Sequence, residues 1–182
     1  MTDRAIVRKG LEAIGRETSE AAIDAALDGY LEILEQEIAS ADGYRLHDGM
    51  LAALDAARTR QATAIGLGTG NVERGAYLKL RRAGVEDRFA FGGFGSDHED
   101  RAELIRIGAE RGAKQLGMNV SHCRVVVIGD TPKDVAAAAA NGAESIGVAT
   151  GPFGAEALRE CGATAVFPDL AAPGALARLL GD

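Results

Sequence analysis

The sequence predicts an α/β protein in which a parallel sheet is flanked by helices. From His47 onward, short apolar segments alternate with helical segments, a pattern typical of parallel sheets with right-handed crossovers. One of these segments, Val125 to Ile128, is a β-branched run without polar alternation, which is typical of a strand covered on both faces. The first 39 or so residues show helical periodicity alone, which predicts a separate helical part.

That helical part is predicted to be an antiparallel pair. A helix from Ala5 to Ile14 ends at Gly15, and a longer one opens at Thr18 or Ser19. Apolar residues recur at helical spacing along the longer helix: Ile23, Leu27, Tyr30, Leu31, Leu34 and Ile38. Such a face must be covered by the rest of the chain or by another chain, so a homo-oligomer is one predicted outcome.

A hinge is expected at Ser40 to Tyr44, where turn residues gather. We therefore divide the chain into a helical part, residues 1–46, and an α/β part, residues 47–182. The predicted strands are Ala62 to Leu67, Phe89 to Phe91, Val125 to Ile128, Ser145 to Ala149 and Ala163 to Phe167. Four predicted helices are Asp48 to Arg58, Val72 to Ala83, Pro132 to Ala140 and Ala171 to Leu180. A fifth is opened by a Ser96–Glu99 capping box and ends near Leu116, and a sixth starts at Ala155.

The stretch from Arg124 to Asp134 carries the clearest signal. An apolar strand runs into Asp130, and a helix then starts with Thr131 as N-cap, proline at its first position and Asp134 at its third. The two carboxylates therefore converge at the carboxyl end of a strand, where open α/β sheets bind their ligands.

Two interpretations of this pair are open. Asp134 can complete a capping box with Thr131 while Asp130 only caps a turn. Capping does not explain a second acid at the strand tip, because two carboxylates repel each other there unless a cation lies between them. Hard oxygen ligands in a small, partly hydrated site favour Mg²⁺. The sequence therefore predicts a Mg²⁺ site formed by Asp130 and Asp134.

A glycine-rich turn, Gly66 to Asn71, follows the first predicted strand. It fits a dinucleotide fingerprint poorly, because asparagine stands at the third glycine position and the next acid, Asp87, precedes a strand. A tight turn without a ligand is a second interpretation. The one we favour is a phosphate site, formed by the Thr69 hydroxyl and the backbone N–H groups of Gly70 and Asn71 at a helix start.

Composition excludes several other classes. The 182 residues with 47% hydrophobic content are ample for a sizeable core. No apolar run approaches the ~20 residues that span a bilayer, and the start lacks a signal sequence, so a cytoplasmic protein without a membrane partner is predicted. Cys123 and Cys161 are too few for a disulfide framework or a Cys-rich zinc site. The net charge of -7 is spread along the chain without a Lys/Arg block, which argues against nucleic acid as a partner.

Three motifs resemble those of the haloacid dehalogenase (HAD) superfamily, in the same order. Thr69-Gly-Asn71 is similar to motif two, Arg101 to motif three, and Gly129-Asp130-x-x-x-Asp134 to motif four. The stretch from Gly92 to Arg101 further resembles HAD hydrolases of the phosphoglycolate-phosphatase type. The resemblance implies a HAD-like Rossmannoid core, and residues 1 to about 45 are similar to the latter part of the family's helical cap.

The resemblance also implies site roles. Thr69 and the Gly70 amide would orient a phosphoryl group of a small phosphorylated substrate, and Asp130 with Asp134 would anchor Mg²⁺. Arg101 would neutralise charge on the phosphoryl oxygens, where the family usually has lysine.

Two further residues could line the substrate opening, Asn71 and His98. For His98 the favoured alternative is a surface residue at a helix start. A surface arginine on a charged helix is likewise the alternative for Arg101.

The first motif of the family is absent. HAD phosphatases attack with the first aspartate of an Asp-x-Asp-Gly-Thr motif and use the second as general acid and base, and this sequence contains no such motif. We expect either a shortened copy of a Mg²⁺-dependent phosphatase acting on a small, phosphoglycolate-like metabolite, or a non-catalytic HAD-fold binding or assembly protein. The chain by itself is predicted to be inactive, and the substrate is not identified.

In the family fold, the motif-one strand lies between the strands of motifs two and four. Without it, Ala62 to Leu67 and Val125 to Ile128 would face each other across a gap with unpaired backbone groups, at ~1–3 kcal/mol for each group. Three outcomes are expected: direct pairing of the two strands, a strand supplied by another chain, or a strand formed by residues before Met1. We favour the third.

Overall fold

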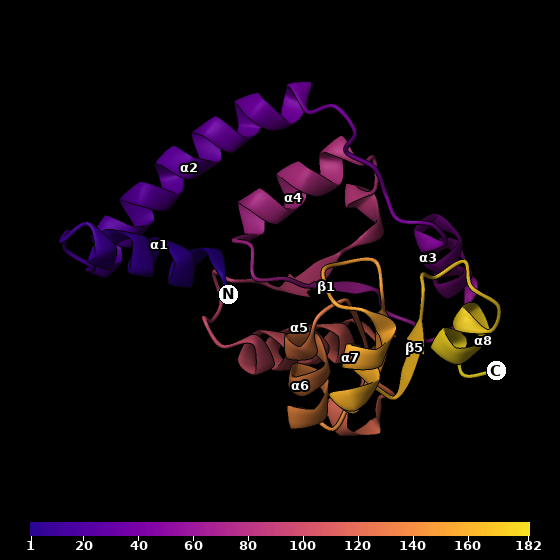
Figure 1. Cartoon of the computed structure of the whole chain (residues 1–182). Helices are drawn as coiled ribbons and strands as arrows, with labels where there is room; N and C mark the ends of the chain where they lie inside the picture. The colour runs from indigo at the N-terminus through magenta and orange to yellow at the C-terminus, as the bar shows by residue number, and fades with distance from the viewer.

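The computed structural model describes all residues from Met1 to Asp182 and contains helices around short strands (Figure 1). The helices are α1 (Asp3–Ala13), α2 (Glu20–Ser40), α3 (Met50–Thr59), α4 (Glu73–Arg82), α5 (Arg101–Gln115), α6 (Pro132–Ala140), α7 (Ala155–Glu160) and α8 (Ala175–Leu180), with short 3-10 helices η1 (Glu86–Arg88) and η2 (Val120–His122). The strands are β1 (Gly66–Gly68), β2 (Phe91–Gly93), β3 (Val126–Gly129), β4 (Glu144–Val148) and β5 (Ala165–Phe167). None of the helices is both long and apolar enough to span a lipid bilayer.

The strands form two separate parallel sheets. β1 pairs with β2, with Leu67 opposite Gly92. β4 lies between β3 and β5, with Ile128 opposite Ile146. This confirms the predicted α/β class with parallel strands and flanking helices. β1 and β3 do not pair with each other, so the direct pairing considered above does not occur.

Helices α5 and α6 connect the two sheets. α5 packs on β1 and β2, α6 packs on β3 and β4, and the two helices pack on each other. In Figure 1 they lie together below β1. α5 approaches β2 closely because Gly93 faces it, and a Cβ at this position would overlap the backbone carbonyl of Leu104. A continuous helical layer therefore holds the two sheets in place although no strand joins them.

The N-terminal helices cover α4. α1 packs on α2, and α2 lies along α4 (Figure 1). Ile23, Leu27 and Leu31 of α2 are buried in one cluster with Val72 and Leu78. The apolar face that needed a cover is therefore covered within this chain. The segment between α2 and α3 contains the predicted domain boundary, and the division itself stays a prediction.

The start of α5 differs from the sequence prediction. Ser96 and Glu99 form no capping box, and α5 begins directly after Asp100, which is its N-cap. The two predicted capping residues bind elsewhere, since Ser96 Oγ accepts a hydrogen bond from Glu73 N at 3.3 Å and Glu99 pairs with Arg8 at 2.7 Å. Contacts with distant elements therefore outweigh the local capping pattern.

β3 is more exposed than predicted. Its apolar run indicated a strand covered on both faces, yet Val126 and Val127 are only partly buried and Ile128 keeps 37% of its surface exposed. The physical reason is that no strand lies beside β3 on the side away from β4.

Candidate functional site

The predicted site residues follow the ends of β1 and β3, and Arg101 of α5 connects them. Its Nη2 donates to the Gly68 carbonyl at 3.1 Å, and Nε and Nη2 donate to Asp134 Oδ1 at 2.9 and 2.5 Å. Gly68 ends β1, and Asp134 lies in the first turn of the helix that follows β3. The carboxyl ends of the two strands therefore meet at one guanidinium group, and β1 and β3 point toward the same site.

Asp134 is buried, and both of its carboxylate oxygens are engaged. The residue is only 4% exposed. Oδ1 accepts from Arg101, while Oδ2 accepts from the Thr131 backbone N at 3.1 Å and from its hydroxyl at 2.8 Å. The capping box predicted at the start of α6 is therefore present. Asp134 holds this strand-to-helix turn in shape, and its role as a metal ligand stays a prediction.

Asp130 differs, because its carboxylate accepts no hydrogen bond and forms no ion pair. The residue is partly buried at the tip of β3. Its side chain lies against Gly151 in the turn after β4, and a Cβ at Gly151 would overlap the carboxylate. Glycine at this position therefore leaves room for the acid. Asp130 is the carboxylate of the site whose oxygens are free to bind a ligand.

The donor set suits Mg²⁺ in the presence of phosphate. No three His, Cys, Asp or Glu side chains converge anywhere in the fold, and Cys123 and Cys161 are free thiols. Mg²⁺ is commonly held by one or two carboxylates, with water and phosphate oxygens completing its coordination. The free Asp130 carboxylate meets the minimum of this requirement, whereas a structural Zn²⁺ site would need four protein ligands.

The turn after β1 presents a free backbone donor. Thr69 Oγ1 accepts a hydrogen bond from Asn71 N at 3.1 Å and donates one to Asn71 Oδ1 at 3.4 Å, whereas the Gly70 amide has no partner. Gly70 lies just before the start of α4, where helix N-termini favour anions. The turn can therefore bind a phosphoryl oxygen, and the assignment of Thr69, Gly70 and Asn71 to a phosphate stays a prediction.

Asn71 is bound by Asp3, a residue that sequence reasoning did not connect with the site. Asn71 Nδ2 donates to the two Asp3 carboxylate oxygens at 3.1 and 3.2 Å, and Val72 N donates to Asp3 Oδ2 at 2.9 Å. Asp3 therefore caps α4, whose own N-cap residue Val72 supplies no capping side chain. No local signal marks this contact, because 68 positions separate Asp3 from Asn71.

Positive charge gathers at the same place. Partial burial lowers the pKa of the Met1 amino group, and the nearby charges of Lys133 and Arg101 lower it further. The site therefore combines the cationic side chains of Lys133 and Arg101 with two carboxylates, and the two cations favour an anion such as phosphate. Lys133 is a second residue that sequence reasoning missed, although a base one position before Asp134 in the motif was a usable signal.

His98 lies outside this site, as its surface alternative predicts. It is exposed, and its Nδ1 accepts a hydrogen bond from Asp100 N at 2.9 Å. It borders a polar hollow between α1, α2 and the loop after β2. There Arg4 and Arg8 are both paired with acidic side chains, including Glu20. These ion pairs leave the hollow without a free cation for an anionic ligand.

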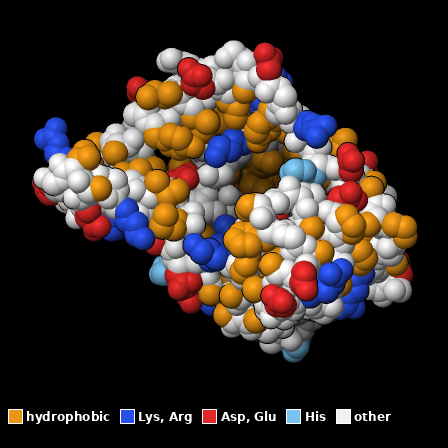
Figure 2. Space-filling view, viewed as in Figure 1, with side chains coloured by type: hydrophobic (Ala, Val, Ile, Leu, Met, Phe, Trp, Pro, Cys, Tyr) orange, Lys and Arg blue, Asp and Glu red, His pale blue; other side chains and the backbone are white.

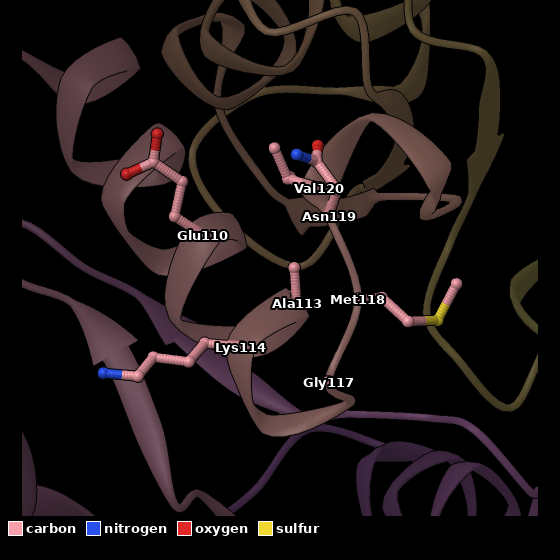
Figure 3. A pocket seen from close by; sticks show the side chains of 7 residues that line it. All are labelled: Glu110, Ala113, Lys114, Gly117, Met118, Asn119 and Val120. Atoms are coloured by element: carbon pink, nitrogen blue, oxygen red, sulfur yellow. The ribbon is translucent and has the colours of Figure 1, made fainter.

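Another hollow lies at the C-terminal end of α5 (Figure 3). It is lined by Glu110, Ala113, Lys114, Gly117, Met118, Asn119 and Val120. The charged ends of Glu110 and Lys114 point in different directions. The hollow adjoins the segment that leads into the amino end of β3, whereas Asp130 follows the carboxyl end of this strand. The hollow therefore does not belong to the site.

Comparisons with known proteins agree with this architecture. A model of the haloacid dehalogenase-like hydrolase family matches residues 3–142. A HAD phosphatase from Thermococcus onnurineus is 18% identical, over 98% of this chain and 88% of its own, with a TM-score of 0.60. A haloacid dehalogenase-like protein from Agrobacterium tumefaciens is 20% identical, over 100% and 79%, with a TM-score of 0.58.

A HAD family hydrolase from Deinococcus radiodurans, with bound phosphate and sodium, is 33% identical over 72% of this chain and 59% of its own, with a TM-score of 0.53. No curated protein matches the sequence. The family match covers well over half of the chain and includes the turn after β1, Arg101 and the β3–α6 turn. The chain therefore belongs to the haloacid dehalogenase-like hydrolase family.

Proposed function

We propose that this chain carries the phosphate- and Mg²⁺-binding part of a phosphatase that acts on a small phosphorylated metabolite of the phosphoglycolate type. The observation that carries the proposal is the position of Arg101. Its guanidinium group bonds to the Gly68 carbonyl at the tip of β1 and to Asp134 at the start of α6, so a cation lies where the turn that bears the Gly70 amide and the turn that bears Asp130 meet.

Arg101 and the β1 turn would bind the phosphoryl group. Nε and Nη2 of Arg101 are held by Asp134 and Gly68, while Nη1 has no partner and is free to donate to an oxygen of the phosphoryl group. The Gly70 amide would donate from the other side, and the Thr69 hydroxyl would join it by exchanging its 3.4 Å hydrogen bond to Asn71 Oδ1 for one to the phosphoryl group. Donors fixed before the ligand arrives stabilise developing charge without reorganisation.

Asp130 would hold Mg²⁺ together with an oxygen of the phosphoryl group, and Asp134 would either share it or orient the turn. When bound, the metal supplies charge neutralisation at the phosphoryl oxygens. The cationic groups of Lys133 and Arg101 support this role, because a doubly charged phosphate needs more than one positive partner. The Deinococcus hydrolase, which was solved with bound phosphate, supports phosphate as a ligand of the fold.

The nucleophile is not among the residues assembled at this site. By resemblance it would be the first aspartate of an Asp-x-Asp motif, which the sequence lacks. The second candidate function is therefore a non-catalytic protein that binds phosphate and metal. It is favoured by the full engagement of Asp134 in structural contacts, which would be kept whether or not catalysis occurs.

Phosphate binding by isothermal titration calorimetry, with Mg²⁺ or with EDTA, tests the proposal. We expect binding that requires Mg²⁺ and that is lost on Arg101→Ala. Arg106→Ala is the matched control, because Arg106 lies on the same helix and pairs only with Glu103 and Glu110. Equal affinity of the two variants would contradict the proposed phosphate site.

Hydrolysis of p-nitrophenyl phosphate and of phosphoglycolate then separates the two candidate functions. Mg²⁺-dependent turnover that survives purification to homogeneity would support an enzyme with a nucleophile we have not identified. Binding without turnover would support the non-catalytic alternative for the chain on its own.

A further inference from the structure

Each of the two acids in the β3–α6 turn lies against a glycine. A Cβ at Gly129 would lie 2.6 Å from Oδ2 of Asp134. A Cβ at Gly151 would overlap Oδ2 of Asp130 and lie 2.8 Å from its Cγ and 3.1 Å from its Cβ. Nonbonded carbon atoms normally stay about 3.5–4.0 Å apart. Each acid therefore occupies space that a side chain at its glycine would need.

The two glycines come from different parts of the chain. Gly129 immediately precedes Asp130, whereas Gly151 lies in the turn that links β4 to α7. β3 and β4 are parallel neighbours, with Gly129 opposite Gly147, so the segments that follow the two strands leave the same edge of the sheet. Figure 2 shows that the molecule is hollowed below α4, and in the same view the turn leading into α7 borders this hollow (Figure 1). The turn after β4 is therefore a third segment at the candidate site.

The backbone does not require glycine at position 151. Gly151 is not among the glycines with positive φ, so alanine can adopt the same backbone conformation. The residue is also exposed. The three atoms nearest to an added Cβ all belong to Asp130. A methyl group at this position would therefore meet the Asp130 side chain before any other group.

Packing is what determines the position of the Asp130 carboxylate. Asp134 is fixed by hydrogen bonds from Arg101 and Thr131. Asp130 has no such partners, and its carboxylate lies in the space that the missing side chain of Gly151 leaves. A side chain there would force the carboxylate to rotate away from its present position at the tip of β3.

We infer that Gly151 is a positioning residue for the metal site. By lacking a side chain, it keeps the Asp130 carboxylate where its free oxygens can bind Mg²⁺ together with a phosphoryl oxygen. A small displacement of a ligand group is enough to weaken such a site, because its geometry must be held closely. The inference rests on the proposed function, since it assigns the turn after β4 a role toward the same Mg²⁺ ion.

The test is a Mg²⁺ titration by isothermal titration calorimetry, with inorganic phosphate present. Gly151→Ala should weaken Mg²⁺ binding roughly tenfold, the loss typical of disturbing a group that orients a metal ligand. Gly154→Ala is the matched control from the same turn, because its φ is -71° and an added Cβ meets nothing within 4 Å. Thermal melting verifies that both variants fold. Equal Mg²⁺ affinity of the two folded variants would overturn the inference.

A double variant tests whether Gly151 acts through Asp130. Gly151→Ala combined with Asp130→Asn should bind Mg²⁺ as weakly as Asp130→Asn alone, because both changes remove the same ligand. A further loss of affinity in the double variant would overturn the inference, since Gly151 would then contribute to the site by another route.

The ¹³C NMR signal of the Asp130 carboxyl carbon gives a readout without metal. The signal is identified by its absence in Asp130→Asn. It should move in Gly151→Ala and stay in place in Gly154→Ala, and an unmoved signal in Gly151→Ala would overturn the inference. If the unmodified chain binds no Mg²⁺, the proposed function is contradicted, while the NMR comparison still decides whether Gly151 positions Asp130.

Discussion

The turn after β1 and the turn after β3 meet at one site but are stabilised in different ways. The β3–α6 turn is closed by its own residues, since Asp134 binds Thr131 three positions away. The β1–α4 turn is closed by Asp3, from the start of the chain. Arg101 then bonds to both turns. A site of this kind can therefore combine a locally determined half with a half that depends on long-range contacts.

The largest expected effect is on the locally closed turn. Asp134→Asn removes the buried charge that pairs with Arg101 and weakens the capping box, so it should lower the free energy of unfolding by about 3 kcal/mol. Urea unfolding followed by circular dichroism measures this. The matched variant Asp130→Asn, four positions earlier and without any partner, should lower it by less than about 0.5 kcal/mol. Similar losses for both variants would contradict the difference between the two acids.

A smaller effect is expected at the long-range turn. Asp3→Ala removes the cap of α4 and the bonds to Asn71, which should cost about 1–2 kcal/mol of unfolding free energy. Asp28→Ala is the control, because Asp28 is exposed on α2 and has no ion pair. If the two variants are equally stable in urea, α4 does not depend on Asp3.

A third expectation concerns the loop after β2, which lies beside the β1 turn. Arg111 pairs with Asp97 at 2.7 and 2.8 Å and lowers the pKa of that carboxyl group, as does the Phe94 N–H. Because the pKa of Asp97 is lower in the folded than in the unfolded chain, its ion pair with Arg111 stabilises the fold fully above the unfolded pKa of 3.8. This stabilisation is lost as the pH falls through the folded-state pKa.

Asp97→Asn should therefore destabilise the protein by ~1 kcal/mol at pH 7, a modest value because Arg111 is 43% exposed at its side chain. At pH 3 or below the difference from the unmodified chain should shrink. Urea midpoints at both pH values measure it, and a difference that does not change with pH would show that the loss has another cause.

The same contrast explains what the sequence could predict. The α/β class and the α6 helix with Thr131 as its N-cap both depend on neighbouring residues, and they are found, whereas the convergence of Asp130 with Asp134 on one cation stays a prediction. The capping box at Ser96 and Glu99 was wrong because Glu73 and Arg8, which come from other helices, bind those residues. The contribution of Asp3 could not be predicted, since its partners lie 68 and 69 positions away. The exposure of Ile128 could not be predicted either, because it results from the absence of a strand beside β3, and the local sequence pattern carries no information about that neighbour.

The measurement that tests the account most directly is a Mg²⁺ titration of the chain and of Asp130→Asn by isothermal titration calorimetry, with phosphate present. Asp130 is the acid with free oxygens, so we expect the variant to keep its fold and to lose Mg²⁺ affinity by roughly tenfold or more. Unchanged Mg²⁺ affinity in a folded Asp130→Asn protein would contradict the assignment of the metal to the tip of β3.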